Sequence, residues 1–332
     1  MLFGCTLAYA AADAPQTLAH IRANGVLHCG IDTEQAEYST SDNHGNRAAF
    51  DTDHCRAVAV AVLGKNAQFT AKQYPDDASA MAALTAGEVD LLPTLTDDFT
   101  HSAGTHIAFT RPLLWDGVSF LIPATSPITR ARQLTGKKIC FLAETTVEES
   151  VRAWFTHEHL NFVSFPFQEE GEMQAAFATG NCGALAGNRT HLAETRATLA
   201  QHGKRTRLLP ETISKDPLAA AVRDNDPAWF AVVNWVMEAL VQAEESGITK
   251  ANVRKVSAQN TDPLIRFLLG ESHQIGTALS LDNDWVVHVI EAVGNYGEIY
   301  DRDLGSSSPL KLPRSNNSLN TRGGLIIALP PK

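Results

Sequence analysis

Hydrophobic and polar residues alternate along this chain in a pattern that repeats. A short helical stretch, a glycine and an apolar strand occur at 17–32 (TLAHIRAN-G-VLHCGID) and again at 129–144 (TRARQLT-G-KKICFLAE). A second pair of segments, 81–94 and 173–188, has the same order of helix, glycine and strand. Glycine is the residue that most often closes a helix, here Gly25, Gly87, Gly136 and Gly180. Two similar α/β units predict two lobes with a cleft between them, in which a small molecule binds.

The remaining periodicity extends both units. Short apolar runs predict strands, and longer runs with helical spacing predict the helices between them. The predicted strands are 26–31, 68–73, 89–92 and 118–122 in or after unit one, and 138–142, 161–165 and 183–186 in unit two. Unit two has predicted helices at 147–158, 169–179 and 190–201, and the chain continues with a strand at 218–222 and helices at 226–246 and 284–301. This alternation predicts an α/β fold with parallel sheets and right-handed crossovers.

Polar residues follow the predicted strands where a ligand would bind. In parallel α/β sheets, ligands bind beyond the carboxyl ends of the strands. That rule selects two groups of residues from each unit, namely Asp32 and Thr33, Thr94 and Thr96, Glu144 with Thr145 and Thr146, and Asn188 with Arg189. Threonines after strands also cap helices, and the two roles are compatible because helix N-termini attract anionic groups. A ligand held between the lobes would touch all four groups.

The composition narrows the class of protein. The 332 residues suffice for two domains, and 44% hydrophobic with 19% charged residues is typical of a soluble globular protein. A net charge of −10 without a basic stripe disfavours nucleic acid and anionic membranes as partners.

The first residues indicate export. The stretch 2–12 is apolar and small, and Ala8-Tyr9-Ala10 resembles a signal-peptidase site, although a basic region before it is missing. We interpret residues 1–14 as a truncated signal segment. The alternatives are a frayed cytoplasmic terminus and a lipid anchor at Cys5.

Four further cysteines indicate the redox state of the cellular compartment in which the protein acts. Cys29 and Cys55 lie in unit one, and Cys140 and Cys182 lie in unit two. One disulfide in each unit is the most economical of three possible pairings, and four buried free thiols are the alternative. Together with the N-terminal segment, the cysteines favour disulfides and an oxidising compartment, so we expect a periplasmic protein.

Six stretches of the sequence, taken together, identify a protein family more specifically than any single motif. They are HCGID (28–32), FDTDHCRAVA (50–59), AGEVDLL (86–92), ISKDPLAAAVRDNDPAWF (213–230), AEESGITKANV (243–253) and LDNDWVVHVIEAVGNYGEIYDRDLG (281–305). Together they make the chain similar to the periplasmic solute-binding proteins of polar amino-acid ABC transporters, in particular the general L-amino-acid-binding branch. The resemblance covers 17–329, and the four cysteines also stand where that branch has them.

The resemblance implies a fold and partners. It implies a two-lobed periplasmic-binding-protein fold of type II, with the ligand cleft between lobes that close by hinge motion. Lobe 1 is expected at 17–120 plus 218–332, lobe 2 at 122–209, and the hinge crossings near 120–124 and 209–217. The implied partners are a small polar ligand, such as an amino acid, and an ABC permease. We expect a monomer without a cofactor.

Three positions depart from the pattern of the family. Its members hold the ligand carboxylate with an arginine after the Ser/Thr motif of lobe 1, and the corresponding residue here is His101. Asn188 replaces an aspartate that contacts the ligand ammonium, and Glu144 replaces a glycine before the lobe 2 threonines. Arginine gives a carboxylate two charged hydrogen bonds, whereas histidine gives one or none. We therefore hypothesise that the ligand lacks a free α-carboxylate or is cationic.

Enzymes are the rival class. The chain has no GxSxG elbow, P-loop or GxGxxG, and its histidines have no recognised metal-ligand spacing. We therefore expect a binding protein, with no catalytic activity and no metal. Cyclohexadienyl dehydratases resemble this family, and in that alternative Asp32, His101 and Glu144 would supply acid–base groups. A sensor, or a paralogue that no longer closes, is a third possibility.

Overall fold

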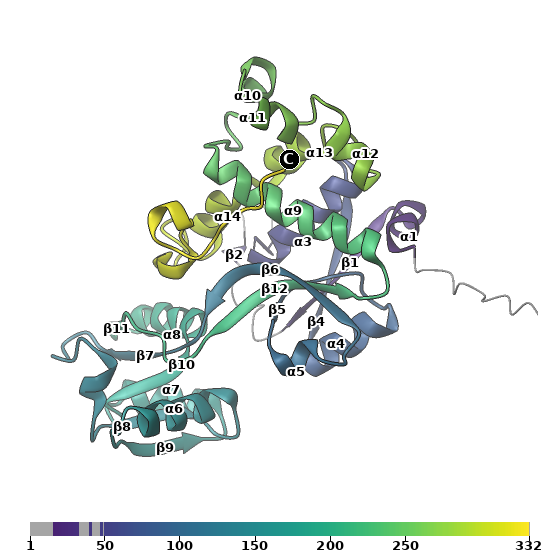
Figure 1. Ribbon diagram of the computed structural model, residues 1–332. Coiled ribbons are helices and arrows are strands. Elements are labelled where there is room, and N and C mark those ends of the chain that lie inside the picture. The colour runs from purple at the N-terminus through teal and green to yellow at the C-terminus, as the bar shows by residue number, and fades with distance from the viewer. Residues whose placement is uncertain (1–15, 33–39, 42–46, 49, 332) are drawn as a thin grey trace, which may run out of the picture.

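The computed structural model describes residues 16–32, 40–41, 47–48 and 50–331, and for Asp32 and the two short segments it describes the backbone alone. Within these ranges the chain forms two bodies joined by crossing strands (Figure 1). We call lobe 1 the body built around two small sheets and most of the helices, and lobe 2 the body built around a 5-stranded sheet.

Lobe 1 contains mixed strand pairings. β1 (Val26–Asp32) pairs in parallel with β4 (Gln68–Tyr74), while β12 (Asp216–Arg223) lies between β5 (Leu92–Thr96) and β6 (Ile107–Asp116) and runs antiparallel to both. The short strands β2 (Thr40–Ser41) and β3 (Arg47–Ala48) pair with each other. The helices are α1 (Thr17–Asn24), α3 (Phe50–Leu63), α4 (Asp77–Ala86), α5 (Phe99–Ser102), α9 (Pro227–Glu245), α10 (Val253–Gln259), α11 (Pro263–Leu268), α12 (Gln274–Leu279), α13 (Trp285–Val293) and α14 (Tyr296–Asp303).

Lobe 2 is one sheet with helices against it. Its strand order is β11-β7-β10-β8-β9, made of β7 (Val118–Pro123), β8 (Lys138–Leu142), β9 (Val163–Phe167), β10 (Ala184–Asn188) and β11 (Thr206–Leu208). The helices are η1 (Ala131–Leu134), α6 (Thr146–His157), α7 (Glu170–Ala178) and α8 (Arg189–Gln201). β8, β9 and β10 are parallel, but β7 is antiparallel to β10 and β11 because it carries the chain into the lobe. The expectation of parallel sheets was therefore wrong for the crossing strands.

The chain passes between the lobes at two places. β6 ends at Asp116 in lobe 1 and β7 begins at Val118 in lobe 2, so the first crossing falls at Gly117. The range 120–124 given by the sequence lies inside or after β7 instead, since Phe120 already pairs with Ala186. The return crossing lies between β11 and β12. Gly117 has a φ of 147°, and a β-carbon there would lie 2.6 Å from the carbonyl oxygen of Ser214 on the return crossing. Only glycine fits this close approach of the two crossings.

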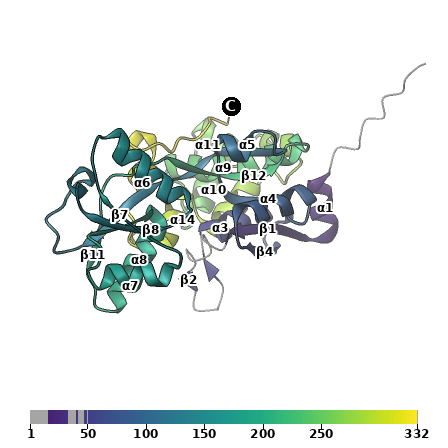
Figure 2. The same cartoon turned by 90° about the horizontal axis from the view of Figure 1, so that it is seen from below.

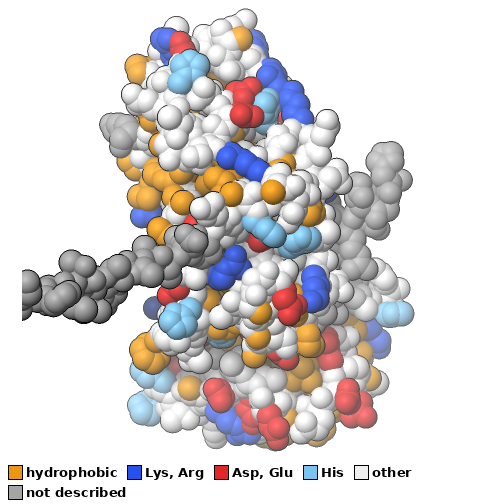
Figure 3. Space-filling view, turned by 90° about the vertical axis from the view of Figure 1, so that its right-hand side faces the viewer, with side chains coloured by type: hydrophobic (Ala, Val, Ile, Leu, Met, Phe, Trp, Pro, Cys, Tyr) orange, Lys and Arg blue, Asp and Glu red, His pale blue; other side chains and the backbone are white. Residues whose placement is uncertain are grey.

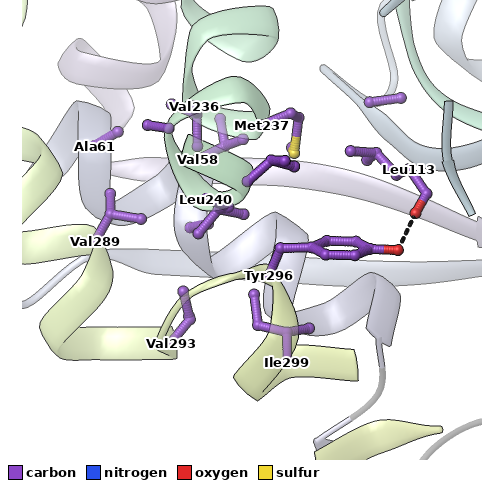
Figure 4. Close-up of a cluster of buried hydrophobic side chains, with 14 of the residues drawn as sticks. Val58, Ala61, Leu113, Val236, Met237, Leu240, Val289, Val293, Tyr296 and Ile299 are labelled. Atoms are coloured by element: carbon purple, nitrogen blue, oxygen red, sulfur yellow. Dashed lines mark hydrogen bonds between the residues drawn. The ribbon is translucent and has the colours of Figure 1, made fainter. Parts of the chain in front are cut away.

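The core of lobe 1 joins segments from both ends of the sequence. Side chains of α3, α9, α13 and α14 pack together, and the Tyr296 hydroxyl donates to the carbonyl oxygen of Leu113 at 2.6 Å (Figure 4). The helix predicted at 226–246 is α9, in which Asp226 accepts from the amide of Trp229 and Pro227 is the first residue. The single helix predicted at 284–301 is wrong: Gly294, with a φ of 86°, ends α13, and Asn295 caps α14.

The disulfide pairing predicted from economy is confirmed. Cys29 is bonded to Cys55 within lobe 1, with Cα atoms 6.4 Å apart. Cys140 is bonded to Cys182 within lobe 2, with Cα atoms 5.8 Å apart. Each bond ties a strand to a later segment of the same lobe, so neither disulfide links the two lobes.

The C-terminal segment, residues 304–331, packs on lobe 1 and includes η2 (Ser315–Asn317) and η3 (Asn320–Arg322). The Asn317 side chain accepts the amide of Trp115 at 2.6 Å and donates to its carbonyl oxygen at 3.0 Å. Arg314 donates to both carboxylate oxygens of Glu244, at 2.9 and 3.1 Å. The segment therefore holds β6 one residue before that strand reaches the hinge.

The surface of lobe 1 mixes charges of both signs. On the face drawn in Figure 3, lysine, arginine, acidic and histidine side chains are interspersed. Among the described residues, no helix combines the length and the apolar character that crossing a membrane requires.

Candidate functional site

The residues predicted at the end of β5 lie beside the hinge in lobe 1. Thr96 is opposite Leu218 of β12, and the next amide, that of Asp97, donates to the carbonyl oxygen of Pro217 at 2.8 Å. The Thr94 hydroxyl is buried and donates to Asp51 at the start of α3 at 2.8 Å. The pairing with β12 fixes the position of this loop, so Thr96 is held close to the return crossing.

His101 is engaged by two carboxylates of lobe 1. Its Nδ1 lies 2.9 Å from Oδ1 of Asp98, the N-cap of α5, and its Nε2 lies 3.7 Å from Oδ2 of Asp77, at the start of α4. When protonated, the ring forms ion pairs with both. Partial burial opposes the ionisation of Asp98, but hydrogen bonds from His101 outweigh it and lower the pKa of this carboxyl group. In this arrangement the imidazole contacts carboxylates of the protein itself.

The predicted residues after β8 form the N-terminus of α6. Thr145 is the N-cap, accepting from the amide of Glu148 and donating to the carbonyl oxygen of Leu142 at 2.9 Å. Thr146 begins the helix and is exposed. Glu144 is also exposed and has a φ of 60°, the left-handed region that glycine adopts without strain. The conformation therefore suits the glycine that the family carries at this position.

Asn188 and Arg189 form the N-terminus of α8. Asn188 is the N-cap residue, and its Oδ1 atom is buried without a hydrogen-bond partner among the described residues. Arg189, selected from the sequence together with Asn188, is buried and donates to the carbonyl oxygens of Leu209 and Pro210 at 3.1 and 3.4 Å. Because it holds the return crossing, Arg189 has a structural role in this arrangement.

Asp116 connects the lobes at the first crossing, and it is not among the residues selected from the sequence. It is buried, and its carboxylate accepts from the amides of Gly117 and Arg189 at 2.8 and 3.0 Å, and from the amide and hydroxyl of Thr190. A carboxylate on one strand thus satisfies the first amides of a helix in the other lobe. Burial raises the pKa of Asp116, although these hydrogen bonds favour the ionised form.

Acidic side chains gather around this crossing. Asp216 is directly opposite Asp116 in the β6–β12 pair. Burial, and then the charges of Asp116 and Asp98, raise the pKa of Asp216. Burial and the adjacent Asp98 raise the pKa of Asp97 as well. The hinge side of lobe 1 is therefore electronegative.

The strand register brings the predicted groups of the two lobes to the same crossing. Thr96 and Leu114 are both partners of Leu218, while Asn188 is the partner of Val118. Leu114 and Val118 are four residues apart, roughly 13 Å along an extended chain. Since β8 and β10 are parallel, the residues after Leu142 lie at the same edge of the sheet as Asn188. Thr33 lies outside the described residues, as does the side chain of Asp32.

A pocket of about 500 Å³ lies elsewhere in lobe 1, between α10, α11 and the loops on either side of α12. Its lining includes Arg266, Glu271, His273 and Asp284, and Arg266 forms an ion pair with Glu271. The predicted ligand residues do not line it. We therefore place the candidate site at the hinge and not in this pocket.

The two lobes, the double crossing and the strand ends that meet beside it define a two-lobed periplasmic-binding-protein fold. A solved structure of an ABC transporter periplasmic binding protein from Brucella ovis, with glutathione bound, is 36% identical, has a TM-score of 0.83, and covers 96% of this chain and 100% of its own. This likeness confirms the predicted fold class.

Curated relatives define the family. The chain is 38% identical over 325 residues to the general L-amino acid-binding periplasmic protein AapJ of Rhizobium johnstonii, covering 97% of this chain and 94% of that protein. It is 36% identical to the glutamate/glutamine/aspartate/asparagine-binding protein BztA of Rhodobacter capsulatus, covering 97% and 95%. No family model matches the chain. The protein belongs to the family of periplasmic binding proteins of amino-acid ABC transporters.

Proposed function

We propose that this protein holds an amino acid or a related small polar solute between its lobes and delivers it to an ABC permease. The observation that supports the proposal is the pairing of Thr96, from lobe 1, and Asn188, from lobe 2, with strands on either side of the same crossing. Ligand contacts from both lobes would shift an open state toward a closed one, which presents the docking surface to the permease. Relatives named as amino-acid-binding proteins support the same function.

The ligand of this proposal lacks a free α-carboxylate or is cationic. His101 is committed to Asp77 and Asp98, and the buried Arg189 is committed to backbone carbonyl oxygens. The carboxylates of Asp97 and Asp216 would repel an approaching anion and attract an amine. Asn188 has an unpartnered amide oxygen that can accept one hydrogen bond from an ammonium group.

Thermal-shift measurements with L-glutamate, L-glutamine, L-arginine, glutathione and putrescine test this ligand class. We expect stabilisation by cationic solutes and little by the anionic ones. The sharper experiment is His101→Arg, which restores a bidentate donor and should add stabilisation by L-amino acids. His106→Arg is the matched control, because His106 is exposed and lies a few residues further along the chain.

The outcomes separate the two levels of the proposal. Strong stabilisation of the wild type by L-glutamate or L-glutamine, with none by putrescine or L-arginine, would contradict the ligand class but support transport. No shift with any solute, together with no compaction in small-angle scattering, would contradict the binding function itself.

We propose that the protein acts in the periplasm as a monomer and without catalysis. AapJ and the Brucella ovis protein are named as periplasmic, and one disulfide in each lobe suits an oxidising compartment. Incubation with prephenate or arogenate should give no product, and product formation would favour the dehydratase alternative. Sedimentation of the purified protein tests the monomer, and fractionation of expressing cells tests the location.

A further inference from the structure

α8 of lobe 2 is attached to lobe 1 at a second place, away from the crossing strands. Arg196 donates from one guanidinium nitrogen to the carbonyl oxygen of Leu310, and the same nitrogen lies 3.4 Å from the carbonyl oxygen of Lys311. Both carbonyls belong to the C-terminal segment. One turn earlier on α8, Ala193 is fully buried among the core side chains of lobe 1.

The C-terminal segment is a firm support for this contact. Leu310 and Leu312 are buried in the core of lobe 1, and the amide of Leu312 donates to the carbonyl oxygen of Leu304 at 2.9 Å. The hydroxyl of Tyr300 donates to the carbonyl oxygen of Pro313 at 3.2 Å. The carbonyls that Arg196 contacts are therefore fixed to lobe 1.

The two attachments of α8 differ in their distance from the pivot. Thr190 is held by Asp116 at the crossing itself, and rotation about the crossing leaves that contact nearly unchanged. Arg196 is six residues further along, about 9 Å at the helical rise. A rotation of about 20° would move it by about 3 Å, more than a hydrogen bond tolerates.

We propose that Arg196 is a positioning residue for ligand binding: by clasping the Leu310 and Lys311 carbonyls it restrains the rotation of lobe 2 about the hinge. Asn188 begins the same helix, so the clasp also sets where this candidate ligand residue stands relative to lobe 1. The proposed restraint does not depend on which solute the cleft accepts.

Arg196→Met tests the clasp, since methionine keeps an apolar stem of similar length and removes the donors. Nitroxide labels at Thr85→Cys in α4 and Glu172→Cys in α7, both exposed positions in opposite lobes, report the distance between lobes by pulsed electron resonance. A Cys5→Ser background leaves only disulfide-bonded native cysteines. We expect the ligand-free distance distribution to shift or widen by about 3 Å. Arg196→Lys, which keeps one charged donor, should restore much of the original distribution.

The matched control is Arg132→Met, because Arg132 pairs with Glu158 inside lobe 2. It should leave the distribution unchanged. Thermal unfolding of each variant checks that the lobes are folded, and if Arg196→Met does not fold, Arg196→Gln replaces it. A distribution that is the same for the wild type and the folded Arg196 variant overturns the proposal, as does an equal change in the Arg132→Met control.

Discussion

Asp116, the last residue of β6 in lobe 1, accepts hydrogen bonds from the amide and the hydroxyl of Thr190 in the first turn of α8 in lobe 2. The two residues are 74 positions apart in the chain and meet at the pivot of the molecule. This contact fixes the start of α8, and with it Asn188, to the strand on which the chain leaves lobe 1.

Asp116→Ala should therefore destabilise the protein. It removes acceptors from the amides of Gly117, Arg189 and Thr190, which remain buried. We expect a loss of roughly 3 kcal/mol in the free energy of unfolding, measured in urea. Glu172→Gln, an exposed change on α7, is the control and should cost less than about 0.5 kcal/mol. A loss for Asp116→Ala as small as that of the control would show that the hinge amides find other partners.

Gly117→Ala should be costly for two separate reasons. The φ of 147° disfavours any side chain, and the new β-carbon would lie 2.6 Å from the Ser214 carbonyl oxygen. Gly104→Ala is the matched control, since Gly104 also has a positive φ but nothing lies within 4 Å of its β-carbon position. In thermal unfolding we expect Gly117→Ala to lose at least about 2 kcal/mol and Gly104→Ala about 1 kcal/mol. Equal losses would mean that the crossing has room for a methyl group.

Asp303 should make the stability fall as the pH rises from about 4 to about 8. Burial, and then the neighbouring carboxylate of Asp53, raise the pKa of Asp303 to about 8, against an ordinary value of 3.8. The folded protein keeps this proton while the unfolded chain releases it. The contribution of Asp303 to the free energy of unfolding is therefore complete below about pH 4 and is lost as the pH rises through 8. The slope should approach about 1.4 kcal/mol per pH unit below pH 8. Asp303→Asn should remove that slope in urea titrations between pH 6.5 and 9. A slope unchanged in this variant would assign it to another group.

His54 should make the stability fall on the acid side. Burial lowers its pKa from 6.5 to about 4, and its Nδ1 lies 2.6 Å from the carbonyl oxygen of Phe50. Here the unfolded chain takes up the proton first, so stability is lost as the pH falls from 6.5 through 4. In thermal unfolding, His54→Gln should lose less stability than the wild type as the pH falls through this range. His157, an exposed residue in the last turn of α6, is replaced by Gln as the control and should leave the loss of stability at acid pH in place.

The two disulfides should contribute separately to their lobes. Cys29–Cys55 closes a loop of 26 residues and Cys140–Cys182 one of 42. Chain entropy gives roughly 3.5 and 4 kcal/mol for loops of these lengths. Replacing Cys140 and Cys182 by alanine should raise the protease sensitivity of lobe 2 more than that of lobe 1, as peptide mapping would show. The Cys29→Ala, Cys55→Ala pair should give the reverse pattern, and a common pattern for both pairs would mean that the lobes unfold as one unit.

Elements with local signals were predictable. The strand 138–142 matches β8 because an apolar run follows Gly136, and Asp226 with Pro227 marks the start of α9. The cysteine pairs followed from their equal arrangement in the two units. In each case the residues that decide the structure are neighbours in the sequence or repeat within it.

The features that could not be predicted depend on contacts between residues that are far apart in the sequence. No residue next to Arg189 in the sequence indicates that it will donate to the carbonyl oxygen of Leu209. In the same way, no residue next to Asp116 indicates that it will accept from the amide of Thr190. β6 was missed because its pairing with β12 joins segments about a hundred residues apart. The helix predicted at 284–301 failed for a local reason, since Gly294 and Asn295 form a stop and a new start that hydrophobic periodicity alone does not show.

The hold of Asn317 on Trp115 has a consequence for the order in which the molecule can be assembled. The sheet of lobe 2 comes from one continuous stretch of chain and can be completed soon after that stretch emerges from the ribosome or the translocation channel. Lobe 1 needs both ends of the polypeptide, and β6 next to the pivot lacks its hydrogen bonds to Asn317 until nearly the last residue has arrived. Nascent chains released early should therefore present a finished small lobe and an unfinished large one to the proteases of the cell.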